Sequence, residues 1–213
     1  TLQAIGDKYG ITRERVRQIE ASSLEDLRRV SVNHPYVERV VAGAADVLQE
    51  MGGVAREELL IEKLKRTLRD KSPDGTFTNV ARFVLEFSKK FFSYRDQKGE
   101  WHPYWYVTES ARRKAHGFVL DLVHTAKTNR AKVLGGDFHT ILAAQSKAAK
   151  ISPEVAKNFV QLSSAFVEGP FGEVGLAEWP EVNPKTARDW AYAVLKREGK
   201  PLHFSGLSEK IGV

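Results

Sequence analysis

Apolar residues recur at intervals of three and four positions along most of the chain, a spacing typical of amphipathic helices. After residue 35 the pattern is regular, and it stops at Gly52 and Gly53, a pair typical of a helix end. Two more helical stretches follow, separated by a loop at residues 72–75. The apolar faces of the three predicted helices carry Val37, Val40, Val41, Ala44, Val47, Leu48 and Met51, then Leu60, Ile61, Leu64 and Leu68, then Val80, Phe83, Val84 and Phe87.

Two short runs rich in β-forming residues come next, at positions 91–94 and 101–107. The stretch between them contains Asp96 and Gly99, and a turn of this composition between two such runs indicates a β-hairpin. Pro103 predicts an edge position for the second strand, because proline has no backbone N–H to donate to a neighbouring strand. Three helices followed by a hairpin is the order of a winged helix-turn-helix.

The same order of elements recurs with different residues. Its third helix is predicted to begin with Ser152 as N-cap and Pro153 at the first helical position, and a hairpin is expected over 166–176. A third unit begins after Pro184, with one helix, then a short helix capped by Ser205. The predicted apolar faces carry Val119, Leu122, Val123 and Ala126, then Phe138, Ile141 and Leu142, then Phe159 and Leu162, and in the third unit Ala187, Trp190, Ala191, Val194 and Leu195.

The first 20 residues have a separate pattern, in which a helix, a turn at Gly10 and a second helix are predicted. Gly6 would let the two helices approach closely. We expect the apolar residues of the segment to form a small shared core, with Val16 and Ile19 on the inner side of the second helix. The residues expected in this core are Ile5, Tyr9, Ile11, Val16 and Ile19.

On the outer side of that second helix, four polar residues share one face, since successive residues are about 100° apart. Arg13 and Arg17 can each bind guanine O6 and N7, Glu14 can accept from the cytosine amino group, and Gln18 can pair with adenine. An ordinary charged helical hairpin is the alternative interpretation. The turn, the apolar spacing and this polar face together favour a helix that enters a DNA major groove.

Residues 1–19, and most specifically the run from Thr12 to Glu20, closely resemble the helix-turn-helix of region 4 in primary-type bacterial sigma factors, which reads the minus-35 promoter element. The resemblance covers about the first 30 residues. It implies that Arg13, Glu14, Arg17 and Gln18 face the groove and that Thr12 lies near a phosphate. Nothing in the chain resembles the region of those factors that melts promoters.

A second resemblance covers the stretch from Trp179 through Asn183 to Phe204, which is similar to the entry into HARE-type winged-helix domains of bacterial transcription and restriction proteins. The predicted organisation is therefore a mostly α-helical chain with small β-hairpin wings. Its predicted parts are a helix-turn-helix at 1–30, winged helices at 31–110 and 111–182, and a truncated third winged helix at 183–213.

Composition narrows the function classes. The net charge of +6 suits a polyanionic partner, although a basic protein without a nucleic-acid role would carry it equally well. The chain has no cysteine, which excludes disulfides and thiolate metal sites and makes a reducing cytoplasm the simplest setting. No apolar run reaches the length of about 20 residues that a membrane span requires.

No catalytic, metal or cofactor site is predicted. The six histidines are scattered without the i, i+4 spacing of a helical metal site, and no phosphate-binding loop or nucleophile elbow is present. The acidic pairs Glu57–Glu58 and Glu25–Asp26 are interpreted as solvated helix faces. We therefore expect a protein that is not an enzyme and has no small-molecule ligand.

Two features have open interpretations. The aromatic cluster Trp101–Tyr106 could stack on bases, or its alternate residues could cover the domain core while the others pack on the next unit. A set of basic residues could face phosphates or simply form the polar sides of helices. This set comprises Lys63, Lys65, Arg66, Arg69, Lys71, Lys89, Lys90 and Arg95.

The sequence thus favours a cytoplasmic, sequence-specific DNA-binding protein of bacterial transcription, with double-stranded DNA as its partner and RNA polymerase as a second candidate partner. One alternative is the DNA-recognition part of a restriction or DNA-processing enzyme. Another is a protein-interaction module whose helix-turn-helix no longer binds DNA.

Overall fold

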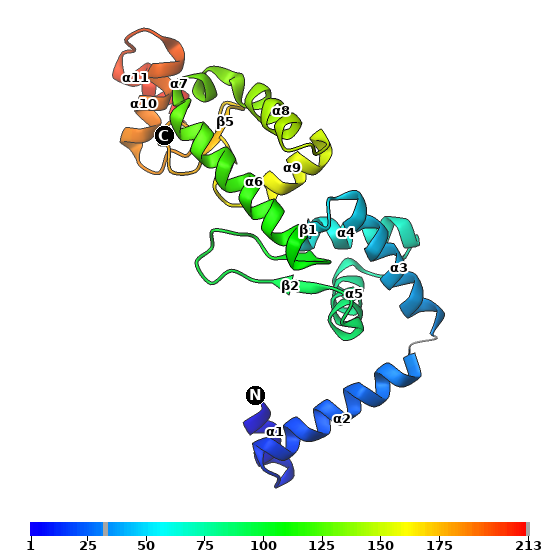
Figure 1. Ribbon diagram of the computed structural model, residues 1–213. Coiled ribbons are helices and arrows are strands. Elements are labelled where there is room, and N and C mark those ends of the chain that lie inside the picture. Colours follow the sequence, from blue (N-terminus) through cyan, green and yellow to red (C-terminus); the bar gives the residue numbers. More distant parts are fainter. Residues whose placement is uncertain (32–33, 212–213) are drawn as a thin grey trace.

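The computed structural model describes residues 1–31 and 34–211, so Val32 and Asn33 of the predicted connector at 31–35 lie outside the described residues. The protein is mostly helical with small antiparallel strand pairs, as predicted. Two helices at the N-terminus stand away from a larger body, and the last two described helices lie at its opposite end (Figure 1).

The first part of the body has the order of a winged helix-turn-helix. Its elements are α3 (Pro35–Glu50), β1 (Val54–Arg56), α4 (Glu57–Leu68), α5 (Asp74–Ser88), β2 (Phe92–Tyr94) and β3 (Tyr104–Tyr106). The three predicted helices and the hairpin are confirmed, and β1 is an additional strand that pairs with β3.

The sheet order β1-β3-β2 makes β3 the central strand, so the prediction of an edge position from Pro103 is wrong. Pro103 lies just before β3, where its missing N–H removes no bond of the ladder. Its carbonyl still accepts a hydrogen bond from the backbone N–H of Glu57 at 2.9 Å. The proline therefore links the wing to the start of α4.

The second part of the body repeats the helical order with a two-stranded sheet. Its elements are α6 (Glu109–Thr128), α7 (Arg130–Lys132), the π-helical turn η1 (Val133–Asp137), α8 (Phe138–Ala148), α9 (Pro153–Gln161), β4 (Phe166–Glu168) and β5 (Val174–Leu176). The Ser152 cap is confirmed, because its side chain accepts from the backbone N–H of Val155 at 3.2 Å.

The described chain ends with α10 (Ala187–Glu198) and α11 (Phe204–Ile211). Thr186 and Asp189 form a capping box at the start of α10. The expected cap at Ser205 is wrong, because α11 begins one residue earlier and places Ser205 inside its first turn. The ring of His203 accepts from the backbone N–H of Ser205 at 3.4 Å, a contact of the kind that an N-cap provides.

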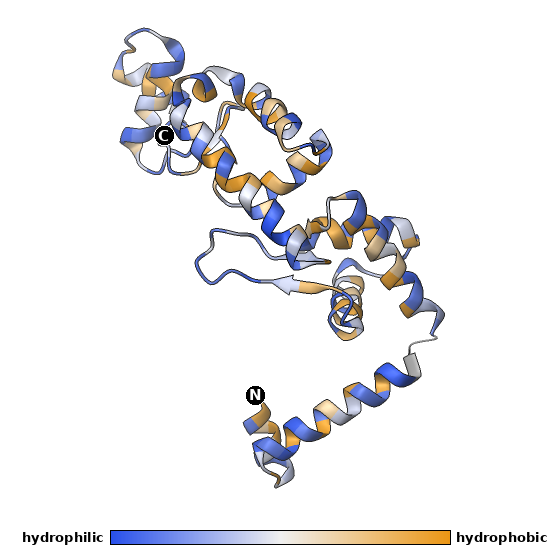
Figure 2. Cartoon of the chain, in the orientation of Figure 1, coloured by the Kyte–Doolittle hydropathy of each residue, from blue (hydrophilic) through white to orange (hydrophobic). Residues whose placement is uncertain are grey.

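The first and second parts of the body are called the two winged parts below. The helices of the first part pack against one face of its three-stranded sheet, and the second part packs against the opposite face. Successive strand residues point to opposite faces, so Trp105 joins the apolar core of α3, α4 and α5 while Tyr104 joins the core around α6 and α9. Figure 2 shows apolar residues along α3, α4, α6 and α9, the helices that supply these cores. Of the two interpretations of the aromatic cluster, the structure confirms packing.

Candidate nucleic-acid interface

The N-terminal segment folds as a helix-turn-helix, as predicted, with α1 (Leu2–Tyr9) and α2 (Arg13–Ser31). Gly10 ends α1 with φ at 67°, a left-handed conformation that glycine adopts at little cost. A Cβ atom on Gly6 would lie 2.6 Å from the carbonyl oxygen of Ile11, so the close approach of the chain after the turn requires glycine there. The Thr12 side chain accepts from the backbone N–H of Arg15 at 3.1 Å and caps α2.

Three of the four predicted base-reading side chains form one connected group. Arg17 donates to both oxygens of Glu14, at 2.9 and 2.7 Å, and Gln18 donates to the same carboxylate at 3.4 Å. Arg13 is exposed next to this group, and all four residues face solvent. Their common face is therefore present, while their contact with DNA stays a prediction.

The electrostatics of this group keep it charged near neutral pH. The hydrogen bond from Arg17 lowers the pKa of the Glu14 carboxyl, and the positive charges of Arg17 and Arg13 act in the same direction. Because the pair is exposed, it contributes little to stability and opens at small cost. Arg17 can therefore leave Glu14 to bind a base, or it can contact a base while it still donates to Glu14.

The predicted core of the helix-turn-helix is wrong for four of its five residues. Val16 is 7% exposed, but Tyr9 is 67% exposed, and Ile5, Ile11 and Ile19 also lie at the surface. Two helices that meet at a tight turn cover only the residues directly between them. The segment consequently carries an open apolar surface in addition to its polar face.

One contact joins this segment to the body near the far end of α2. The Arg28 guanidinium donates to the carbonyl of Phe87 at 3.0 Å and lies 5.5 Å from the centre of the Phe87 ring. The sequence gives no local signal for this contact, because it joins residues far apart in the chain. It places the C-terminal end of α2 against α5. The predicted base-reading face lies near the other end of α2, away from the body (Figure 1).

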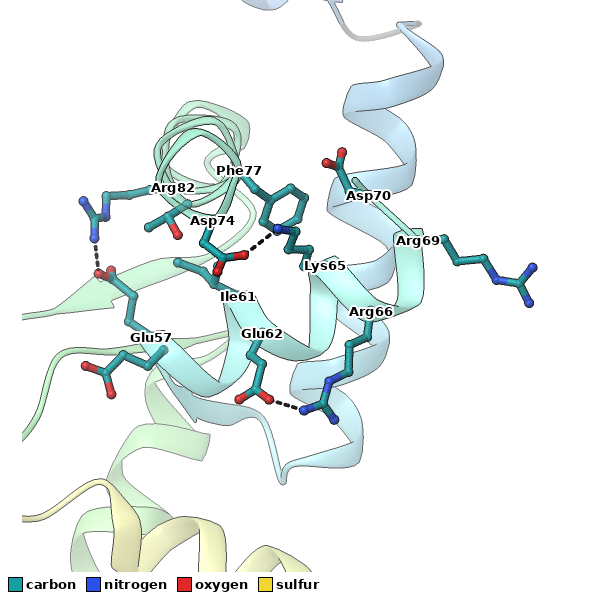
Figure 3. Close-up of a pocket in the computed structure, with 12 residues that line it drawn as sticks. Glu57, Ile61, Glu62, Lys65, Arg66, Arg69, Asp70, Asp74, Phe77 and Arg82 are labelled. Carbon is teal, nitrogen blue, oxygen red and sulfur yellow. Dashed lines mark hydrogen bonds and ion pairs between the residues drawn. The ribbon is translucent and has the colours of Figure 1, made fainter. Parts of the chain in front are cut away.

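Four of the eight basic residues considered above are engaged in ion pairs, and three of these four lie on α4. Lys65 pairs with Asp74 across the groove between α4 and α5, and Arg66 pairs with Glu62, whereas Arg69 points away from this groove (Figure 3). Lys63 and Arg95 are paired as well. Of that set, Arg69, Lys71, Lys89 and Lys90 make no salt bridge among the described residues, so the structure favours the polar-side interpretation for α4.

Glu57 corrects the interpretation of Glu57–Glu58 as a solvated pair. Its carboxylate is buried and accepts from Arg82 at 2.6 Å, Arg95 at 3.2 Å and the Trp105 indole N–H at 3.0 Å. Glu58 is exposed as predicted. The signal was present in the sequence, because Glu57 lies three residues before Leu60 and so on the apolar side of α4.

The groove between α4 and α5 has a volume of about 680 Å³ and is lined by charges of both signs (Figure 3). Arg82 and Glu57 pair at one end, and Lys65 and Asp74 pair across the middle. This internal neutralisation leaves it without a strong preference for an anion or a cation. Within residues 1–31 and 34–211, no group of three potential metal-ligating side chains lies close enough to hold an ion.

The wing of the first part of the body packs on the second part. Trp101 stacks on the His116 ring, with centroids 3.7 Å apart, and the backbone of His102 donates to Leu162 at 2.8 Å. The N–H of Ser164 donates to the carbonyl of Glu100 at 3.0 Å. Residues 100–102, which follow the tip of the wing, are therefore occupied by contacts with the second part of the same chain.

One face of α9 is committed to the same junction. The Asn158 amide donates to the carbonyls of Met51 at 2.8 Å and Val54 at 2.7 Å. Gly52 makes room for α9, since a Cβ there would lie 2.6 Å from the Val155 side chain. In the second winged part, α9 is the third of the long helices, the one that a helix-turn-helix would place in a groove. Because of this packing, α9 is less available to read bases than α2.

The site is a helix-turn-helix that presents an exposed Arg, Glu and Gln face, the class of element that binds a DNA major groove. Residues 1–29 match the family model described as sigma-70, region 4. The match covers α1 and nearly all of α2 and does not extend into the body. Comparison with curated proteins and with solved structures gives no match for the chain. None of the described helices is long and apolar enough to cross a membrane.

Proposed function

We propose that this chain is a sequence-specific DNA-binding protein of bacterial transcription, which recognises a promoter element similar to the minus-35 element. The observation that carries the proposal is the match of residues 1–29 to sigma-70 region 4. The connected, exposed group of Glu14, Arg17 and Gln18 on α2 supports it.

In this proposal, α2 lies in the major groove and its polar face specifies the bases. Arg13 and Arg17 bind guanine edges, Glu14 accepts from cytosine, and Gln18 pairs with adenine. Thr12 lies at the N-terminal end of the helix, where its hydroxyl hydrogen is available to a phosphate oxygen while its oxygen caps the helix. The phosphate contacts set the register, and the base contacts set the sequence.

The body has a scaffolding role in this proposal, and the protein acts by binding and not by catalysis. The junction of its two winged parts occupies residues 100–102 of the wing and one face of α9. Such a body offers surfaces to other proteins, of which RNA polymerase is the first candidate. A HARE-like third winged helix at the C-terminal end remains a prediction.

Selection from a random duplex library tests the proposal. We expect a short motif related to the minus-35 element, and we expect Arg17→Ala or Glu14→Ala to relax the preference and to weaken binding about tenfold. Arg29→Ala is the matched control, because Arg29 is exposed on the same helix and has its own i, i+3 partner, Asp26. The selected motif should be unchanged in that control.

Salt dependence gives an independent measurement on the same duplexes. Lys and Arg contacts to phosphates release condensed counterions, so the affinity should fall steeply as salt rises. No measurable binding at low salt would contradict the DNA-binding proposal. An unchanged motif in both Arg17→Ala and Glu14→Ala would instead show that the base-reading face is wrongly assigned.

A further inference from the structure

A second groove lies between α6 and α8 and has a volume of about 850 Å³. Along α6 it extends from Arg113 to Asn129, which corresponds to about 24 Å at 1.5 Å per residue. This length matches about four turns of an α-helix. The groove belongs to the second winged part and does not include any residue of the proposed DNA-reading face.

The wall of this groove is mostly apolar and contains several small residues. Phe118 and Phe159 are buried beneath it, and Ile141 is half-buried at its side. Gly117 on α6 and Ala144 on α8 also line it. A Cβ atom on Gly117 would meet nothing within 4 Å, so there is open space above this point of α6. Small residues of this kind allow a partner backbone to approach closely.

The two ends of the groove are cationic. Arg113, Lys114 and Lys132 line it, and none of the three forms a salt bridge within the described part of the chain. Glu109, one turn before Arg113 on the same helix, is already paired with Arg112. Asp121 is the one carboxylate among the lining residues. The groove between α4 and α5 differs, because its charges pair with one another.

We propose that the groove between α6 and α8 binds an amphipathic helix of a partner protein, about four turns long, with acidic residues near both ends of an apolar stripe. The apolar wall would receive the stripe, as in other grooves that bind helices. Arg113 and Lys114 at one end and Lys132 at the other would face the acidic residues. A nucleic-acid backbone fits less well, because it offers no apolar surface to cover this wall.

Selection from a displayed library of helical peptides, with the full chain as target, tests this proposal. We expect the selected peptides to combine an apolar stripe with flanking Glu and Asp residues. Gly117→Leu should fill the open space and weaken their binding about tenfold or more, while the fold is kept because leucine is a better helix former than glycine. Lys114→Glu should shift the preference away from acidic peptides.

Lys157→Glu is the matched control, because Lys157 is an exposed cation of the same winged part, on α9, and does not line the groove. Thermal unfolding of each variant checks its fold. Peptides without acidic enrichment, or acidic peptides that bind Gly117→Leu as well as the parent chain, would overturn the proposal. Weaker duplex binding or weaker self-association in Gly117→Leu, without an effect on peptides, would also overturn it and assign the groove to nucleic acid or to a second copy.

Discussion

At the scale of single residues, the same type of contact has opposite consequences at two places in this molecule. The pair of Glu14 and Arg17 is exposed, so water competes for both partners and the pair is free to rearrange. Glu57 is buried, and its carboxylate is held by Arg82, Arg95 and Trp105. Burial removes the competing water, which turns the second contact into a fixed structural element.

Removal of the Glu57 carboxylate should therefore destabilise the fold. Glu57→Ala leaves the Trp105 indole N–H and the Arg82 guanidinium without their acceptor, at an expected cost of about 3 kcal/mol in the free energy of unfolding. Urea unfolding of the full chain measures this value. Glu58→Ala is the matched control, because Glu58 is the next residue, is exposed and should change stability by less than about 0.5 kcal/mol. Equal values for the two variants would contradict the structural role of Glu57.

At the scale of elements, the long helices were predictable because each presents several turns of regular apolar spacing. The strand β1 was not, because three residues between Gly53 and Glu57 are too few to show a period. The edge position predicted from Pro103 was wrong because the sequence does not show whether a proline lies inside a strand or just before it. The packing of the wing on α6 was predicted only as one of two outcomes, because it depends on contacts between residues far apart in the chain.

The junction of the wing with α6 should weaken in acid. The neutral His116 ring stacks on Trp101, and its Nε2 atom lies 2.6 Å from the Tyr104 hydroxyl. Burial lowers the pKa of His116 from its usual value of 6.5, and the charge of Arg112 acts in the same direction, while Glu109 and Asp96 oppose the shift.

The sign of the effect follows from this lowered pKa. Below a pH of about 6.5 the unfolded chain binds the proton more readily than the folded protein, so the free energy of unfolding decreases as the pH falls. Unfolding measured between about pH 7 and about pH 5 should show this slope, and His116→Gln should reduce it. His124→Gln, at an exposed position on the same helix, is the control and should leave the slope unchanged. An identical slope in His116→Gln would exclude this histidine as its source.

At the scale of the whole molecule, the parts that could touch DNA are unequally available. The helix-turn-helix stands away from the body, whereas the wing and α9 meet at the junction of the two winged parts (Figure 1). The face on α2 was predictable from the sequence, since it depends only on positions within one helix. The separation of this face from the winged parts was not predictable. It depends on how the elements of residues 35–182 pack against one another, and those contacts join residues far apart in the chain. In the proposed function, α2 therefore reads duplex DNA while the body remains free for contacts with other proteins.

The last prediction concerns promoter opening, which requires aromatic side chains that capture unstacked bases at a cost of a few kcal/mol per step. The dense aromatic cluster of this chain is not available for that task, because Trp105 and Tyr104 are each 1% exposed and Trp101 is stacked on His116. The exposed aromatic residues of the described chain, Tyr9, Phe83, Phe92, Tyr192 and Phe204, lie on five separate elements.

We therefore expect the chain to bind duplex promoter DNA without melting it when it is the only sigma-like factor added to core RNA polymerase. Permanganate footprinting, which detects unpaired thymines, measures this directly, and a complete primary sigma factor with the same core enzyme and promoter is the positive control. Protection of the duplex without reactive thymines is the expected result. Reactive thymines with this chain and core enzyme alone would show that the body supplies a melting function, and they would make the protein an initiation factor in its own right.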